Sequence, residues 1–214
     1  MKIVIADPLP TSAADLLLDQ GWEVDARSGR PPAELADALT DAVGLIVRST
    51  TRVDADLIGA APNLKVIGRA GTGVDNVDLE ADSARGILVV NAPGANSISV
   101  AEHAFALLLA SARSVTEADA HMKAHRWEKK SLVGTEVRGK TLGVVGLGRI
   151  GREVVHRGHA FGMRTVAHDP FIARQVATDL NVELLDLNEL CAQADFITLH
   201  LPASDDHPLF DAKR

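Results

Sequence analysis

A glycine loop between a predicted strand and a predicted helix constrains the fold of this chain more than any other feature. Residues 141–145 (TLGVV) are uncharged and mostly apolar or β-branched, which predicts a short buried strand. They run directly into residues 146–151 (GLGRIG), a G-x-G-x-x-G sequence, and a helical stretch follows. The next predicted strand, residues 164–168, ends at Asp169. This order of strand, glycine loop, helix, strand and acid is typical of a parallel sheet that binds a dinucleotide.

The residues of the loop have separate physical roles. Gly146 permits the tight turn, Gly148 lets backbone amides approach a pyrophosphate, and Gly151 lets the helix pack closely on the strand. The N-terminus of the helix offers unpaired N–H groups and a partial positive charge to phosphates. Asp169 can accept hydrogen bonds from ribose hydroxyls, and its charge opposes the 2′-phosphate of NADP. The nearest basic residue, Arg174, lies five positions further on, so we expect the cofactor to be NAD.

The composition is that of a globular protein with a substantial core. Of the 214 residues, 46% are hydrophobic and 24% are charged, and the net charge of −7 argues against nonspecific nucleic-acid binding. The single cysteine, Cys191, excludes an internal disulfide. Residues 2–6 are too short for a signal-peptide core, and the most apolar run, residues 104–110, is shorter than a bilayer span. We expect a cytoplasmic protein with neither a nucleic-acid nor a membrane partner.

Strand and helix patterns alternate through the first 95 residues. Short apolar strands separated by helices indicate a parallel sheet covered on both faces. The predicted strands lie near residues 3–6, 22–25, 45–47, 65–68 and 87–90. Residues 91–96 (NAPGAN) are typical of a hinge, with adjacent Pro and Gly and little apolar content. We therefore expect an α/β protein of two parallel-sheet domains. A flavodoxin-like substrate domain should occupy residues 1–95, and an incomplete Rossmann dinucleotide-binding domain residues 96–214.

Two arginines follow predicted strands of the first domain. Arg48 comes directly after one strand, and Arg69 ends the next and opens residues 69–73 (RAGTG), a loop whose amides could face an anion. Ligands of such sheets lie beyond the carboxyl ends of the strands. These positions favour a small anionic substrate. The alternative is that the arginines form structural salt bridges with Asp75 and Asp78.

A strongly apolar helix is predicted after the hinge. Ser99 and Glu102 match a capping box, so this helix should begin near residues 97–99. Its apolar residues cover most of the circumference, which predicts burial between domains or against a second subunit. On the next predicted helix, His121 and His125 stand at i and i+4, a spacing that can hold a metal. No third ligand is evident, and we expect a solvated helix face rather than a metal site.

With both halves in view, the chain resembles the D-isomer-specific 2-hydroxyacid dehydrogenases. The resemblance covers essentially every residue and rests on five segments. They are residues 47–51 (VRSTT), 68–78 (GRAGTGVDNVD), 86–93 (GILVVNAP), 127–128 (WE) ahead of 134–136 (GTE), and 143–151 (GVVGLGRIG). The second segment looks like the phosphoglycerate branch of the family. The resemblance implies NAD-dependent oxidation of 3-phosphoglycerate to 3-phosphohydroxypyruvate, the entry step of serine synthesis.

The resemblance also implies roles for particular residues. Arg48 and Arg69 would hold the anionic groups of the substrate. The helices after residue 97 would form the interface of a homodimer or homotetramer. The residues expected to contact the cofactor, in addition to the glycines, are Thr72, Arg149, Ile150, Asp169 and Leu201.

The chain departs from the family in one respect that bears on catalysis. The arginine, glutamate and histidine that catalyse the family's reaction would lie beyond Arg214, and His200 is expected to be structural. We therefore expect a fragment or truncated product of such a dehydrogenase, without 3-phosphoglycerate-dependent NADH production. The loop at residues 204–208 is also altered from the usual pattern. Two alternatives are a non-catalytic module that binds NAD or an anion, and another family member such as a glyoxylate or hydroxypyruvate reductase.

Overall fold

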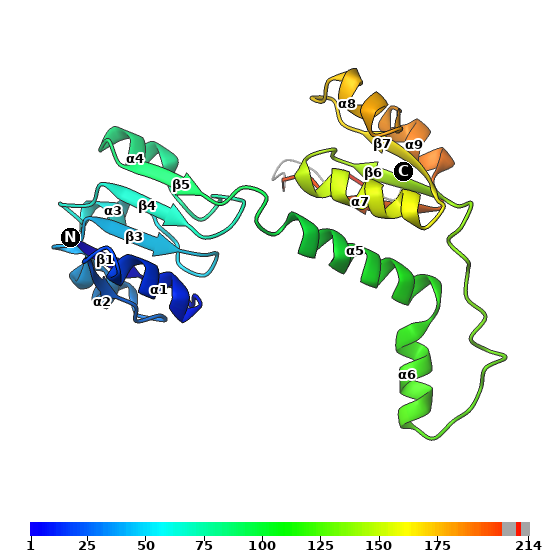
Figure 1. Cartoon of the computed structure of the whole chain (residues 1–214), viewed down its shortest axis with the longest axis horizontal. Coiled ribbons are helices and arrows are strands. Elements are labelled where there is room, and N and C mark those ends of the chain that lie inside the picture. Colours follow the sequence, from blue (N-terminus) through cyan, green and yellow to red (C-terminus); the bar gives the residue numbers. More distant parts are fainter. Residues whose placement is uncertain (203–208, 211–214) are drawn as a thin grey trace. The chain divides into compact units, whose positions relative to one another are not determined.

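The protein is an α/β chain that divides into two compact units. The computed structural model describes residues 1–202 and 209–210, so the altered loop at 204–208 lies outside the described residues. Unit 1 comprises Met1–Asn96 and unit 2 comprises Ser97–Arg214 (Figure 1). Each unit contains one parallel sheet, as the alternation of strand and helix patterns predicts, and the α/β class is confirmed.

Unit 1 is built on a five-stranded parallel sheet in the order β2-β1-β3-β4-β5. Its strands are β1 (Lys2–Ile5), β2 (Glu23–Asp25), β3 (Gly44–Val47), β4 (Val66–Arg69) and β5 (Leu88–Asn91). Its helices are α1 (Thr11–Leu18), α2 (Pro32–Leu39), α3 (Ala55–Gly59) and α4 (Leu79–Ala84). The register aligns the strand ends, and Val47 of β3 lies beside Arg69 of β4. The loops that follow β3 and β4 therefore meet at one edge of the sheet.

The core of unit 1 lies between the sheet and the helices α2 and α3. Leu45 and Ile67 of the strands are fully buried against Leu39 of α2 and Ile58 of α3. Helix α1 contributes no buried residue. The buried core of this unit is therefore formed by the sheet with α2 and α3 rather than by α1.

Unit 2 contains a four-stranded parallel sheet in the order β8-β7-β6-β9. Its strands are β6 (Thr141–Val145), β7 (Arg164–His168), β8 (Glu183–Leu184) and β9 (Phe196–Leu199). Its helices are α5 (Ser97–Ala112), α6 (Val115–Lys123), α7 (Arg149–Ala160), α8 (Arg174–Asp179) and α9 (Leu187–Gln193). The long connection at residues 124–140 joins α6 to β6 (Figure 1). The central strand β6 carries the predicted glycine loop at its carboxyl end.

Helix α5 packs on α7 along one face only. Ala101, Phe105 and Ala112 are buried, and the ring of Phe105 stacks on Phe161 with centroids 5.3 Å apart. The exposed side of α5 mixes apolar residues such as Leu107 with the polar residues Glu102 and His103. The helix begins at Ser97, as predicted, but Ser99 lies inside it. The capping box predicted at Ser99 is therefore wrong, because a cap residue precedes the first helical turn.

No single helix among the described residues is long and apolar enough to cross a bilayer. Helices α5 and α6 together meet the length and composition criteria, but they bend by 67° at their junction.

Candidate functional site

The glycine loop of unit 2 lies where the ends of three strands meet. Gly146 directly follows β6 and adopts a left-handed φ of 94°. Its N–H donates to the carbonyl of His168 at the end of β7 (2.9 Å). A Cβ atom at this position would lie 2.4 Å from the carbonyl oxygen of His200, which follows β9. Backbone conformation and packing therefore both require glycine here.

The other two glycines of the loop differ in what an added side chain would contact. A Cβ atom on Gly151 would lie 2.0 Å from the carbonyl oxygen of Gly146, so α7 could not approach the loop with any larger residue. Gly148 has an ordinary φ of −64°, and a Cβ atom there would meet no described atom within 4 Å. Neither strain nor packing within the described residues explains Gly148. It leaves open space in front of the helix, as expected where a ligand approaches the backbone.

The first turn of α7 is free to bind an anion. Gly148 is its N-cap residue, and no side chain among the described residues caps the helix. The first turn contains no acidic residue that would repel a phosphate. The N–H groups of the first turn lack intrahelical acceptors in any α-helix, and the helix dipole adds partial positive charge. This helix end therefore suits the pyrophosphate of a dinucleotide.

Asp169 connects the end of β7 to the glycine loop. Its Oδ2 accepts a hydrogen bond from the Leu147 N–H, and its Oδ1 accepts one from the Phe171 N–H, both at 2.9 Å. A carboxylate has about four acceptor positions, so capacity for ribose hydroxyls remains. Arg152, which sequence reasoning missed, also braces the loop by donating from Nε to the Leu147 carbonyl at 3.0 Å.

The remaining cofactor residues predicted in unit 2 lie at the same edge of the sheet. Arg149 and Ile150 form the first turn of α7, and Leu201 follows the end of β9 with 43% of its surface exposed. The structure thus brings together the predicted residues of unit 2 that lie on the ends of β6, β7 and β9. Thr72 belongs to unit 1.

The two predicted arginines of unit 1 line one cavity. Arg48 follows β3 and Arg69 ends β4, and the cavity between their loops has a volume of about 410 Å³. The other residues that line it are small or polar: Ser49, Ala70, Gly71, Ala92, Ala95 and Asn96. The cavity lies beyond the carboxyl ends of the parallel strands, where α/β sheets bind ligands.

The loop that carries Arg48 is fixed by two residues distant in sequence. Asp7, 3% exposed at the end of β1, accepts hydrogen bonds from the Arg48 N–H (2.6 Å), the Thr51 N–H (3.2 Å) and the Thr51 hydroxyl (2.7 Å). Asn76 donates from Nδ2 to the carbonyls of Arg48 (2.7 Å) and Thr51 (2.6 Å). The backbone of Arg48 is therefore held on both sides, while its side chain is exposed.

Arg69 presents an unsatisfied donor. Its Nε is buried and has no hydrogen-bond partner among the described residues. The guanidinium lies over Gly71, where a Cβ atom would come within 1.7 Å of Nη1. In the described part of the chain no carboxylate forms an ion pair with Arg48 or Arg69, and Asp78 instead caps α4 through the Ala81 N–H. The geometry thus gives no support to the salt-bridge alternative.

Thr72 is held by two asparagines that the sequence did not single out. The Thr72 hydroxyl donates to Oδ1 of Asn96 at 2.7 Å, and Nδ2 of Asn91 donates to the Thr72 carbonyl at 2.7 Å. Both asparagines belong to the predicted hinge at residues 91–96. They therefore tie the loop after β4 to the end of β5.

The histidines have structural surroundings. His121 is buried beside Glu117 and Glu128, at 3.9 and 3.6 Å, whereas His125 lies beyond the end of α6 with a φ of 56°. The predicted i, i+4 helix face is therefore wrong for this pair. Nε2 of His200 contacts the Thr198 hydroxyl at 2.9 Å, and burial lowers the pKa of His200. The described residues contain no cluster of three or more His, Cys, Asp or Glu side chains that could hold a metal.

The two parallel sheets and the glycine loop define an α/β protein of the class that binds a dinucleotide beyond the carboxyl ends of its strands. Residues 3–199 match the family model described as D-isomer specific 2-hydroxyacid dehydrogenase, catalytic domain. The chain belongs to this family, which confirms the resemblance inferred from its sequence.

Individual relatives give the extent of the match. The chain is 52% identical over 203 residues to D-3-phosphoglycerate dehydrogenase of Methanocaldococcus jannaschii, covering 94% of this chain and 38% of that protein. Among solved structures, the TT0316 protein from Thermus thermophilus is 40% identical with a TM-score of 0.88, over 96% of this chain and 66% of that one. An NAD-dependent formate dehydrogenase from Staphylococcus aureus, in complex with NAD, is 29% identical with a TM-score of 0.82, again over 96% and 66%. The chain therefore spans about two fifths of the length of the curated relatives it matches.

Proposed function

We propose that the chain provides the substrate-binding and NAD-binding parts of an enzyme that oxidises 3-phosphoglycerate to 3-phosphohydroxypyruvate, the first step of serine synthesis. Unit 1 has the strand order 2-1-3-4-5 of flavodoxin-like sheets and binds the substrate. Unit 2, counted from β6, has the order 3-2-1-4 of the first strands of a Rossmann sheet and binds NAD. We expect the enzyme to act in the cytoplasm.

The cofactor assignment rests on the loop after β6. Gly148 leaves open space at the uncapped start of α7, and Asp169 presents a carboxylate at the end of the next strand. NAD, when bound, supplies the hydride acceptor, while the loop and helix hold its pyrophosphate. Asp169 favours NAD over NADP because a 2′-phosphate would lie against its negative charge. The S. aureus formate dehydrogenase, bound to NAD in its structure, is a relative of the same fold.

The substrate assignment rests on the cavity of unit 1. A substrate with both a carboxylate and a phosphate has two anionic groups, and Arg48 and Arg69 offer two cations to them from adjacent strand ends. The presence of both arginines on one cavity is the single observation that carries the proposal, because neither forms an ion pair with a carboxylate among the described residues. The curated relatives at about half identity are D-3-phosphoglycerate dehydrogenases.

Calorimetric titration of the full chain with 3-phosphoglycerate tests the substrate assignment. Arg69→Met should weaken binding by roughly 10- to 100-fold, the effect of losing one or two charge-assisted hydrogen bonds. Arg52→Met is the matched control, because Arg52 is exposed in the same unit and does not line this cavity. An equal loss of binding in both variants would point to general electrostatics and reject the proposed site.

The same titration separates the alternatives. Tighter binding of glyoxylate than of 3-phosphoglycerate would favour a glyoxylate or hydroxypyruvate reductase. If the chain binds NAD but none of the hydroxyacids tested, the result would favour a non-catalytic binding module. Titration with NAD and NADP tests the cofactor assignment separately, and equal affinity for both would reject the role given to Asp169.

A further inference from the structure

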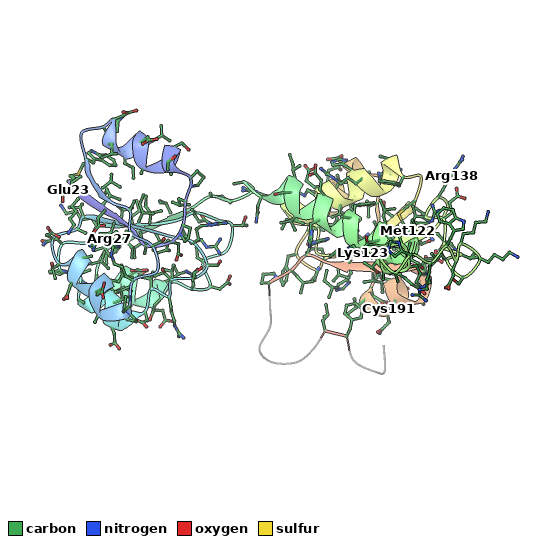
Figure 2. The ribbon with its side chains drawn as sticks, turned by 90° about the horizontal axis from the view of Figure 1, so that it is seen from below. Glu23, Arg27, Met122, Lys123, Arg138 and Cys191 are labelled. Carbon is green, nitrogen blue, oxygen red and sulfur yellow. The ribbon has the colours of Figure 1, made fainter. Side chains whose placement is uncertain are left out.

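Phe171 is the most exposed large hydrophobic side chain among the described residues, at 95%. It lies between the end of β7 and the start of α8, at the edge of the sheet that carries the glycine loop. The next most exposed, Val133 and Trp127, lie on the connection that follows α6, the helix that carries Met122 (Figure 2). Phe171 therefore differs from them in standing beside the proposed cofactor site.

The backbone around Phe171 is held in place. Its N–H donates to Oδ1 of Asp169 at 2.9 Å, and the ring of Pro170 fixes the φ angle of the preceding residue. Ile172, the next residue, packs against the hydrophobic core of unit 2. The phenyl ring is therefore presented to solvent by an anchored turn rather than by a loose segment.

The ring of Phe171 has no aromatic partner in the described part of the chain. The ring pair found there is Phe105 with Phe161, whose centroids lie 5.3 Å apart. Aromatic rings gain stability from an offset stack on another flat π-system, beyond what burial of their surface contributes. A flat ring that lies beside a ligand site and has no partner within the described protein is therefore available to a flat group of the ligand.

The carboxylate of Asp169 would bring one particular flat group to this position. Its two oxygens accept the N–H groups of Leu147 and Phe171, and its remaining acceptor positions can bind the hydroxyls of the adenosine ribose. The adenine base is bonded to that same ribose, so it would lie within side-chain reach of the residues next to Asp169. Two of these, Pro170 and Phe171, are exposed and uncharged, and they offer the base an apolar surface.

We infer that the ring of Phe171 stacks on the adenine of NAD and positions the adenosine half of the cofactor. The inference rests on the proposed cofactor assignment and adds a residue to it. Stacking depends on the face of a base and not on its edge, because every base has a π-face. The site should therefore accept another purine in place of adenine, whereas it discriminates at the ribose through Asp169.

Calorimetric titration of the full chain with NAD and with nicotinamide hypoxanthine dinucleotide tests the inference. The second compound keeps the purine ring and changes its hydrogen-bonding edge. We expect the two affinities to agree within about threefold. A loss of more than about tenfold for the hypoxanthine compound would show that the edge of the base is recognised, and would overturn the inference.

Substitutions of Phe171 locate the contact. Phe171→Ala should lower NAD affinity about tenfold or more, the effect of losing one stack between a base and an aromatic side chain. Phe171→Leu is apolar but not flat and should lose most of this affinity, while Phe171→Tyr keeps the flat ring and should stay within about twofold of wild type. Because the side chain is exposed, all three variants should keep the wild-type melting temperature.

Trp127→Ala is the matched control, because it removes an exposed aromatic ring of the same unit from outside the cofactor site. Its NAD affinity should change less than about twofold. Unchanged affinity in Phe171→Ala, equal losses in Phe171→Ala and Trp127→Ala, or a loss in Phe171→Tyr as large as in Phe171→Ala would each overturn the inference and leave the cofactor assignment in place. Absence of NAD binding by the wild-type chain would instead reject the cofactor assignment, and the inference with it.

Discussion

Asp82 is a carboxyl group that the fold buries without a hydrogen-bond partner. It lies on α4 with 1% exposure, and among the described residues neither of its oxygens accepts a hydrogen bond. Burial, and secondarily the charge of Asp78, raise the pKa of Asp82 from 3.8 to about 6. The folded chain therefore holds this proton more tightly than the unfolded chain, and the folded carboxyl is neutral at mildly acidic pH.

This shift predicts how stability should depend on pH. Because the folded pKa is raised, the stabilising contribution is complete below about pH 4 and is lost as the pH rises through 6. Asp82→Asn cannot ionise, so it should stabilise the chain at pH 8 by roughly 1–3 kcal/mol relative to its effect at pH 4. Urea denaturation at the two pH values measures this difference. Glu80→Gln, an exposed change on the same helix, is the control, and an Asp82→Asn effect independent of pH would contradict the prediction.

Gly148 and Gly151 have different roles in the glycine loop and should respond differently to the same added methyl group. The added methyl group of Gly148→Ala would contact no described atom, so the melting temperature should change little. NAD affinity should fall about tenfold or more, because the methyl group would lie where the pyrophosphate approaches the backbone. Gly151→Ala places Cβ 2.0 Å from a carbonyl oxygen and should destabilise unit 2, although alanine normally favours a helix by about 1 kcal/mol. Melting curves and NAD titration together check both outcomes. Unchanged NAD affinity in folded Gly148→Ala would contradict the assigned loop.

At the scale of elements, local pattern and long-range pairing account for different parts of the structure. The strands and the glycine loop could be predicted because period, apolar content and glycine spacing are properties of short segments. The supports of Arg48 could not, because Asp7 lies 41 positions before it and Asn76 lies 28 positions after it. Such contacts can be predicted only once the order of the strands in the sheet is known. The prediction that His121 and His125 share a helix face is wrong for a local reason. Helix α6 ends at Lys123, so His125 lies outside it.

Asn76 allows a direct test of how one loop supports another. Asn76→Ala removes two hydrogen bonds to the loop after β3 and should destabilise the chain by roughly 1–3 kcal/mol. It should also weaken 3-phosphoglycerate binding, because the backbone of Arg48 loses one of its two supports. Asn63→Ala is the matched control, since its Nδ2 donates to the Thr40 carbonyl and lies outside the cavity. Calorimetry measures the substrate affinity of both variants. Equal affinity of Asn76→Ala and Asn63→Ala for 3-phosphoglycerate would contradict the prediction that Asn76 supports substrate binding.

For the whole molecule, the exposed face of α5 around Leu107 bears on assembly. Leu107 is 59% exposed and lies on the other side of the helix from the buried Phe105 and Ala112. We propose that this face takes part in the interface of a homodimer or homotetramer, as the family resemblance implies for the helices after residue 97. Leu107→Glu should shift the chain to a smaller species in light scattering coupled to size-exclusion chromatography. Leu16→Glu, on a comparably exposed leucine of α1, should leave the mass unchanged, and identical masses for wild type and Leu107→Glu would exclude this face as the interface.

The contact of Gly146 with His200 has a consequence for the order of folding. The glycine loop needs the ends of β7 and β9 in place, and β9 lies furthest along the chain among the described strands. Contacts between segments so distant in sequence form slowly, because a long loop must close before they stabilise anything. Helix α7 should therefore acquire its structure early in refolding, while the capacity to bind NAD returns only with the slowest phase of sheet formation. Stopped-flow refolding, followed by far-ultraviolet circular dichroism and by NAD binding, should show the two signals separated in time, and simultaneous recovery would exclude this order.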